Sequence, residues 1–322
     1  MEAVLECCCG LDVHRDNVVA CILKGSNEHR PEKTLKTFSS LPDGLKKLRA
    51  WLEEENCRHA AMESTGVYWQ PVYNVLEEAF DGTMVVMVVN ARHMRNVPGK
   101  KTDMKDAEWI SQLLRSGLLD ASFIPSKPVR ELRELTRYRK TMVEEIAAQK
   151  NRVEKFLQST GFKLSTFCSD VFGVSGKAIL EHLVEHGSIS PSRVEVLLKG
   201  RLRVKRDEIA LATAGSLTEL QQDFLGMLLK HLYQLESNIP EIDQKINQVA
   251  SKFVLQLDQL DGIPGIDKVA AQAVLAEIGT DMSKFKTAAH LCSWAGLSPG
   301  NNESAGKKSP FAPPKGTPTS RE

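Results

Sequence analysis

The chain has 322 residues, which is enough for two or three domains that each bury a core. Its hydrophobic content of 42% and charged content of 26% are ordinary for a soluble globular protein. No apolar run reaches the length of a membrane span, and the start MEAVLECCCGLDV lacks the basic segment and long apolar stretch of a signal peptide. We therefore expect a cytoplasmic protein that has no membrane partner.

The seven cysteines include the adjacent group Cys7-Cys8-Cys9, and no two cysteines form a CxxC pair. Without such a pair, a zinc site is disfavoured. Three adjacent cysteines in a strand-like run indicate reduced, half-buried thiols in a cytosolic protein.

The net charge is only +1, so the chain lacks the overall basic character of many nucleic-acid-binding proteins. The basic residues are nevertheless clustered in three segments: 92–106, 127–155 and 199–206. Such clusters can follow a phosphate backbone, but each can also be a solvated helix face. Both interpretations stay open for the three clusters together.

The first 125 residues predict an α/β domain. Two β-rich runs, 4–14 and 17–24, predict a hairpin, and 34–38 predicts a third strand. The next segments alternate between helix and strand. They are helical spacing at 41–55, a short strand at 59–63, a helix at 68–80, a fully buried strand at 83–89 and a helix at 103–118. A hairpin followed by alternating strands and helices is the order of a ribonuclease-H-like (RuvC-like) fold.

The remainder predicts helices. Residues 126–256 carry two long amphipathic stretches, the second interrupted by Pro240, which indicate an antiparallel helical hairpin or a dimerising coiled coil. Residues 257–308 predict a small helical domain, and the proline-rich end 309–322 predicts a disordered tail.

Residues 257–279 have the pattern of a helix-hairpin-helix, with Gly262, Pro264 and Gly265 in the turn. Glycines permit a tight turn whose backbone N–H groups can face a phosphate of DNA. An ordinary connection between two helices has the same pattern.

Four acids stand where a metal site could form. Asp12 lies late in the first strand, Glu63 ends the strand at 59–63, and Asp103 and Asp106 open the helix after the last strand. Residues three apart share a helix face, and hard divalent cations prefer carboxylate oxygens. Capping and the helix dipole explain Asp103 and Asp106 taken alone, so only their combination with Asp12 and Glu63 favours the metal site.

Four stretches of the chain keep a common order: GLDVHRDNVVACIL, AMESTGVYWQPVYNVLE, VVNARHMRNVPGKKTDMKDAEWISQLLRSGLL, and the segment from GIPGIDKVAAQAVLAEIG to FKTAAHLCSWAGLSPGNNESAGKK. Together they resemble the DEDD insertion-sequence transposases, also called the IS-one-ten group. The resemblance implies that Asp12, Glu63, Asp103 and Asp106 are the four acids of a RuvC-like catalytic domain. It also implies a Mg²⁺ cofactor, with two ions, and an enzyme that recombines DNA.

The resemblance further implies a nucleophilic serine, Ser304, in the sequence Ser-Ala-Gly-Lys. This serine would form a covalent link to DNA, and it would act in a site shared between subunits of a homo-oligomer. Members of the family are guided by an element-encoded RNA. We expect DNA contacts from Lys307 and from three lysines around the start of the helix at 103–118: Lys100, Lys101 and Lys105.

The sequence departs from the family pattern after Lys308, which predicts a truncated or frameshifted product in which Ser304 is poorly held. Two other functions stay open. A metal nuclease of the Holliday-junction-resolvase type would use the four acids and water, and an inactive remnant would only bind DNA. An actin-like ATPase is disfavoured because His14-Arg15-Asp16 replaces the small phosphate-cradling turn of such folds.

Overall fold

The computed structural model describes residues 4–26, 29–64, 66–90 and 106–297, together with the backbone of 303–304 and 307–308. The chain divides into two compact units, Met1–Ile124 and Pro125–Glu322. Each unit has its own hydrophobic clusters and is described separately below.

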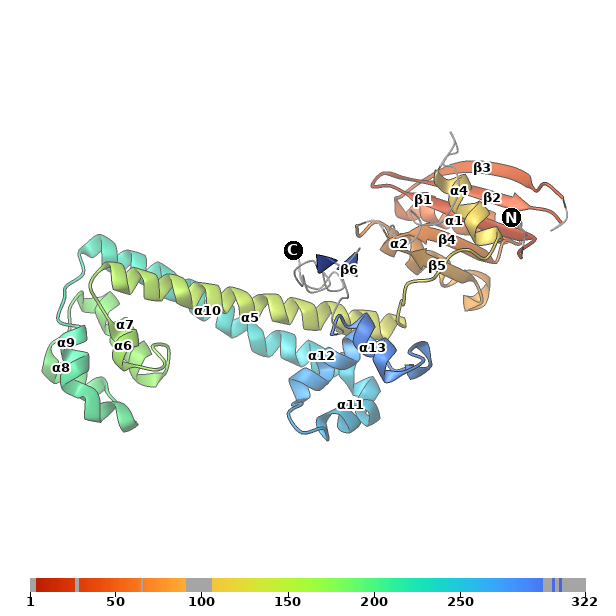
Figure 1. Cartoon of the computed structure of the whole chain (residues 1–322). Helices are drawn as coiled ribbons and strands as arrows, with labels where there is room; N and C mark the ends of the chain where they lie inside the picture. The colour runs from red at the N-terminus through yellow and green to blue at the C-terminus, as the bar shows by residue number, and fades with distance from the viewer. Residues whose placement is uncertain are drawn as a thin grey trace. The chain divides into compact units, whose positions relative to one another are not determined.

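Unit 1 is built on a five-stranded mixed sheet with the order β3-β2-β1-β4-β5. Its strands are β1 (Cys7–Val13), β2 (Asn17–Lys24), β3 (Glu32–Ser39), β4 (His59–Glu63) and β5 (Val85–Val89). The first three pair antiparallel, whereas β4 runs parallel to β1 and β5 runs parallel to β4. The predicted hairpin and third strand are confirmed, and this mixed sheet with its helices fits a ribonuclease-H-like α/β fold (Figure 1).

Helices cover both faces of this sheet. On one face, α1 (Pro42–Glu54) and α2 (Trp69–Leu76) pack over a cluster that includes Leu11 and Met62, and the short η1 (Ala79–Gly82) follows. On the other face, α4 (Asp106–Arg115) packs over Cys8 and Ala61. Because strand side chains alternate between faces, neighbouring cysteines of β1 serve both clusters. All cysteines of the described residues are free thiols.

The prediction of a fully buried strand at 83–89 is wrong. Strand β5 is the edge of the sheet, and the side chain of its first residue, Val85, is 48% exposed. The unbroken apolar run in this segment is typical of a central parallel strand. Here Met84, Val88 and Val89 are buried, whereas the three residues between Met84 and Val88 are exposed or only partly buried.

Unit 2 contains two long helices, α5 (Lys127–Ser159) and α10 (Glu219–Ala250), which lie side by side in Figure 1. Three contacts show that they run antiparallel: Arg139 pairs with Asp243, Lys150 pairs with Glu236, and Gln149 donates to the carbonyl of Leu228. Of the two arrangements that the sequence left open, the antiparallel pairing within one chain is therefore present.

The expected interruption at Pro240 is wrong, because α10 continues through this residue. Proline removes one helical hydrogen bond and crowds the carbonyl four residues earlier. Packing on both sides of the proline opposes this cost, since Leu232 and Ile242 are buried, and Ile242 lies in the same cluster as Met142 of α5. Tertiary contacts here outweigh a local helix-breaking signal.

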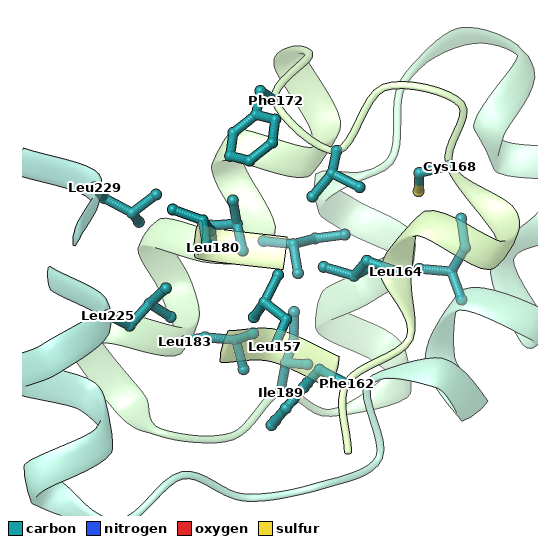
Figure 2. Close-up of a cluster of buried hydrophobic side chains, with 14 of the residues drawn as sticks. Leu157, Phe162, Leu164, Cys168, Phe172, Leu180, Leu183, Ile189, Leu225 and Leu229 are labelled. Atoms are coloured by element: carbon teal, nitrogen blue, oxygen red, sulfur yellow. The ribbon is translucent and has the colours of Figure 1, made fainter. Parts of the chain in front are cut away.

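One end of the long pair carries a compact group of short helices. They are α6 (Leu164–Phe167), α7 (Val174–His186), α8 (Pro191–Leu197), η2 (Gly200–Lys205) and α9 (Arg206–Ala212). Their core joins Phe162, Leu164, Leu180 and Leu183 to Leu225 and Leu229 of α10 (Figure 2). We call this group the distal module.

The opposite end of the pair carries η3 (Ser251–Phe253), α11 (Val254–Asp261), α12 (Lys268–Ile278), η4 (Met282–Lys284) and α13 (Ala288–Trp294). The Arg133 side chain of α5 fixes α12 there, because it donates to the carbonyls of Ala276 and Glu277 at 2.9 and 2.8 Å. Short strands β6 (Glu303–Ser304) and β7 (Lys307–Lys308) follow. Among the described residues, no helix combines the length and the apolar character that crossing a membrane requires.

Candidate active site

Two of the predicted acids lie side by side at one edge of the sheet. The register of β1 and β4 pairs Gly10 with Ala61 and Leu11 with Met62, so the next step of the same register sets Asp12 beside Glu63. Neighbouring strands lie about 4.8 Å apart, and residues two apart point to the same face. Asp12 therefore shares the face of Gly10, and Glu63 shares the face of Ala61, which is the face that α4 covers.

Helix α4 runs opposite to β1 and points its N-terminus at this edge. Its second residue, Ala107, lies directly over Gly10, and its last residue, Arg115, accepts a hydrogen bond of 2.7 Å from the N–H of Val4. Asp106, the first residue of α4, is consequently at the end where Asp12 lies, and its side chain is exposed. Three of the four predicted acids, Asp12, Glu63 and Asp106, thus lie on one face of the unit 1 sheet, where β1 and β4 end and α4 begins. We call this place the acidic edge.

A buried serine fixes α4 in this position. Ser111 is 0% exposed, and its hydroxyl accepts from the N–H of Gly10 at 2.7 Å and donates to the carbonyl of Cys21 at 2.6 Å. Gly10 and Cys21 are register partners in the β1–β2 ladder, so the hydroxyl bridges two strands at once. Only glycine permits this approach, because a Cβ at residue 10 would lie under 3.0 Å from backbone atoms of Ala107 and Ser111.

The surroundings of Asp12 are polar and partly open to solvent. Its side chain is 25% exposed, and its Oδ2 lies 2.9 Å from Nε2 of His14, whose side chain is 58% exposed. His14 therefore faces solvent beside the turn and is joined to Asp12 by a hydrogen bond. Glu108 of α4 does not join these acids. Its Oε2 lies 3.0 Å from Nζ of Lys33 on β3. It therefore belongs to the sheet surface and not to the acidic edge.

The donor set of this edge suits a hard divalent cation. Carboxylate oxygens at the end of parallel strands and at a helix N-terminus are typical Mg²⁺ ligands. The fit is partial, since no group of three or more His, Cys, Asp or Glu side chains close enough to hold an ion occurs in the described part of the chain. Asp103 and the three lysines Lys100, Lys101 and Lys105 lie outside the described residues. Their contribution to the site remains a prediction.

The turn between α11 and α12 only partly matches its expected form. Gly265 has a φ of +91°, which favours glycine, whereas Gly262 is helical with a φ of −67°. The N–H groups of Gly262 and Ile263 bond carbonyls of α11, and the N–H of Ile266 bonds the carbonyl of Ile263. Pro264 has no N–H to donate. Within residues 262–266, the N–H of Gly265 is therefore the one backbone donor that has no partner among the described residues. The role of Gly262, Pro264 and Gly265 in DNA binding remains a prediction, and Gly265 is the residue of the three whose N–H is placed to serve it.

The predicted nucleophile lies in a short hairpin of unit 2. In its backbone register, Ser304 of β6 pairs with Lys307 of β7, and Glu303 pairs with Lys308. The side chains of these residues lie outside the described part of the structure, so the role of Ser304 remains a prediction.

Gly10 and Ser111 are the positioning residues that the sequence reasoning missed. The sequence did contain a signal for Ser111. This serine follows Ile110 by one residue, precedes Leu114 by three, and lies on an otherwise apolar helix face. Gly10, two residues before Asp12, was visible in the sequence too. Glycine is needed there because of the close approach of α4, a helix more than ninety residues away in sequence.

Replacing Ser111 with alanine is expected to lower the free energy of unfolding by about 1–3 kcal/mol, because Gly10 N–H and Cys21 C=O lose their shared partner inside the core. Urea denaturation measures the change. Ser116→Ala is the matched control, since Ser116 follows the same helix and is only half-buried. Equal losses in the two variants would contradict the bridging role of Ser111.

An acidic edge on a mixed α/β sheet defines a candidate metal-dependent nucleic-acid enzyme. Two family models match this chain: one described as "Transposase", for DEDD transposases of the IS110 type, over residues 9–162, and one described as "Transposase IS116/IS110/IS902 family" over residues 257–320. The chain belongs to the IS110 family of DEDD transposases, and it is an enzyme of the transposase and recombinase class.

The second match continues past Lys308, the residue after which the sequence departs from the resemblance described above. Among solved structures, the chain is similar to "Thermus thermophilus RuvC structure" with 12% identity and a TM-score of 0.28, over 36% of this chain and 99% of that one. No curated protein matches the chain.

Proposed function

We propose that this transposase cuts and rejoins DNA strands with the acidic edge of unit 1, a divalent metal and Ser304. The observation that carries the proposal is the position of Asp12 beside Glu63, at the end of two parallel strands and on the face where α4 begins with Asp106. Packing explains none of these three acids, because each is at least partly exposed. Acids gathered at one strand end are what phosphoryl transfer requires of a protein.

Asp12, Glu63 and Asp106, joined by Asp103, are the residues that would hold Mg²⁺, with two ions. When bound, such ions polarise a phosphodiester and stabilise charge on attacking and leaving oxygens. The protein contributes the position of the ligands. Ser111 holds α4 against β1, and His14 orients Asp12 through its hydrogen bond.

Ser304 is proposed as the nucleophile. Its Oγ forms a bond to a DNA phosphorus while the bond from phosphorus to the 3′ oxygen breaks, so a phosphoserine link and a free 3′ hydroxyl result. The serine proton passes to solvent, and the 3′ oxygen takes a proton from solvent. A 3′ hydroxyl of the joining strand then attacks the same phosphorus and releases the serine, which conserves the number of phosphodiester bonds.

Backbone and lysine donors would hold the DNA. The free N–H of Gly265 stands next to the N-terminus of α12, where the helix dipole favours a phosphate. Lys100, Lys101, Lys105 and Lys307 would add charge close to the acids and to Ser304. Backbone contacts of this kind bind DNA with little sequence preference.

We also propose that the enzyme works as a homo-oligomer and takes its target choice from an element-encoded RNA. Family membership supports both statements. Sedimentation with and without a transcript of the element's non-coding end tests them together. A monomer that ignores the transcript would contradict both.

Replacing Ser304 with alanine is expected to abolish the covalent protein–DNA adduct and strand transfer, because alanine has no oxygen to attack phosphorus. The assay uses the full chain, Mg²⁺ and a duplex that carries an end of the insertion sequence, and it detects adduct as a denaturant-resistant band. Ser309→Ala is the matched control, since this serine lies five residues further on and outside the Ser-Ala-Gly-Lys motif.

Two outcomes would replace the proposal. Cleavage that persists in Ser304→Ala without an adduct would show that water is the nucleophile, as in a resolvase-type nuclease. DNA binding without nicking in the unsubstituted chain would show a non-catalytic DNA-binding protein.

A further inference from the structure

A basic segment of the distal module, residues 199–206, is firmly anchored in the core. Leu198 just before it and Ile209 just after it are both 0% exposed, and Leu202 in its middle packs on the same cluster that Figure 2 shows. The N–H of Lys199 also donates to the Ser175 hydroxyl at 2.8 Å. The backbone between these anchors is therefore fixed, and its side chains project from a defined surface.

All five basic side chains of this segment are exposed: Lys199, Arg201, Arg203, Lys205 and Arg206. Three of them are held by neighbours. Arg203 donates its Nε to the carbonyl of Leu198, Lys205 lies 3.4 Å from the carbonyl of Phe167, and Arg206 pairs with Glu195. These contacts orient the three cations, and the terminal nitrogens of Arg203 make no hydrogen bond within the part of the chain that the structure describes.

Lys199 and Arg201 differ from the other three. Their side chains make no hydrogen bond or ion pair with any residue that the structure describes. The segment 199–208 holds five basic residues and two acids, Asp207 and Glu208, so it keeps a charge of +3 in a chain whose total is +1. Between the cations, Val204 is 90% exposed. A surface with a fixed backbone, a net positive charge and an apolar tip fits a polyanion that also offers apolar sugar edges.

We propose that residues 199–206 form a second DNA-binding surface, which contacts the sugar-phosphate backbone of duplex DNA. The inference rests on the proposed action on DNA. Charged side chains at fixed positions suit regularly spaced phosphates. The segment contains no aromatic residue, and proteins that hold single strands stack bases on aromatic rings. A duplex backbone is therefore the matching ligand.

The test is the double variant Lys199→Gln, Arg201→Gln in the full chain, because neither side chain supports the fold. We measure its affinity for a duplex of about four helical turns that carries an element end, at several salt concentrations. Each lost phosphate contact lowers the salt slope by about 0.9, so the slope is expected to fall by about 2. We expect the affinity at low salt to fall by roughly tenfold or more.

Two controls separate position from charge. Lys140→Gln, Lys245→Gln removes two exposed lysines of the long helices and gives the same change in net charge. Lys199→Arg, Arg201→Lys keeps both charges in place. Both controls are expected to bind like the unsubstituted chain.

An unchanged slope in the Lys199 and Arg201 double glutamine variant would overturn the inference, and so would an equal loss in the Lys140 and Lys245 control. If the double glutamine variant changes the salt slope for binding a structured RNA but not for binding the duplex, the surface would be assigned to RNA instead of DNA. If the unsubstituted chain binds no duplex at all, the proposed function itself fails, and that result is distinct from a failure of this surface.

Discussion

Asp12→Asn is expected to reduce DNA strand cleavage by on the order of 10³-fold and to leave the free energy of unfolding close to that of the unsubstituted chain. Asparagine keeps the shape of the side chain and one acceptor oxygen for His14, whose Nε2 lies 2.9 Å from Asp12 Oδ2. It loses the negative charge that a hard divalent cation requires. A metal contribution of several kcal/mol to the transition state corresponds to a loss of this size.

Asp16→Asn is the matched control, because Asp16 lies in the turn that follows the strand of Asp12 and its side chain is 86% exposed. The two variants change net charge equally, so only the position of the acid differs. Cleavage rates are measured under single-turnover conditions with Mg²⁺, and stability is measured by urea denaturation. Loss of activity in both variants, or a cleavage rate for Asp12→Asn within a few-fold of the unsubstituted chain, contradicts the assignment of Asp12 as a metal ligand.

Gly10→Ala is expected to destabilise unit 1 by about 3 kcal/mol or more and to abolish activity with it. The added Cβ would overlap the carbonyl oxygen of Ala107 and the backbone nitrogen of Ser111. Backbone atoms cannot rotate away as a side chain can, so α4 must shift from the sheet. Such a shift moves Asp106 away from Asp12 and Glu63. Thermal and urea denaturation, followed by circular dichroism, measure the loss.

Gly226→Ala is the control for replacing a glycine as such. Gly226 lies inside α10, and a Cβ there would meet only a side-chain carbon of Val184 at 3.3 Å, so the change is expected to be small or stabilising. The double variant Gly10→Ala, Ser111→Gly tests the cause directly. Removing the serine side chain is not expected to restore stability, because the overlap with Ala107 is with the backbone. Recovery of stability in the double variant would contradict this explanation.

Sequence patterns predicted most of unit 1 because its signals are local. Alternation in β1 and β2, the polar turn between them and the apolar spacing of α1 each fall within about fifteen residues. The failures involve neighbours that are distant in sequence. The exposure of β5 depends on its place at the end of the sheet, and the helix at Pro240 persists because α5 packs against it.

The candidate site divides in the same way. Residue type and order along the chain are enough to indicate Asp12, Glu63 and Asp106 as candidate ligands. What the sequence could not supply is the register that sets Asp12 beside Glu63, or the hydroxyl of Ser111 between β1 and β2. Those are relations between segments, and one sequence read along its length contains no measure of them.

The paired long helices of unit 2 fix the distance between the parts of the unit that they connect. Helix α5 has 33 residues and so spans about 50 Å. The C-terminal end of α12 is fixed near the start of α5 through Arg133, and the distal module is fixed near the end of α5 through Leu157. The 24 residues between these two anchors rise by about 36 Å, which is close to the length of one turn of B-form DNA. The two proposed backbone-binding surfaces are thereby carried by helices that are anchored at opposite ends of this pair. The length of the helices, and not any base contact, would define how much DNA one subunit covers.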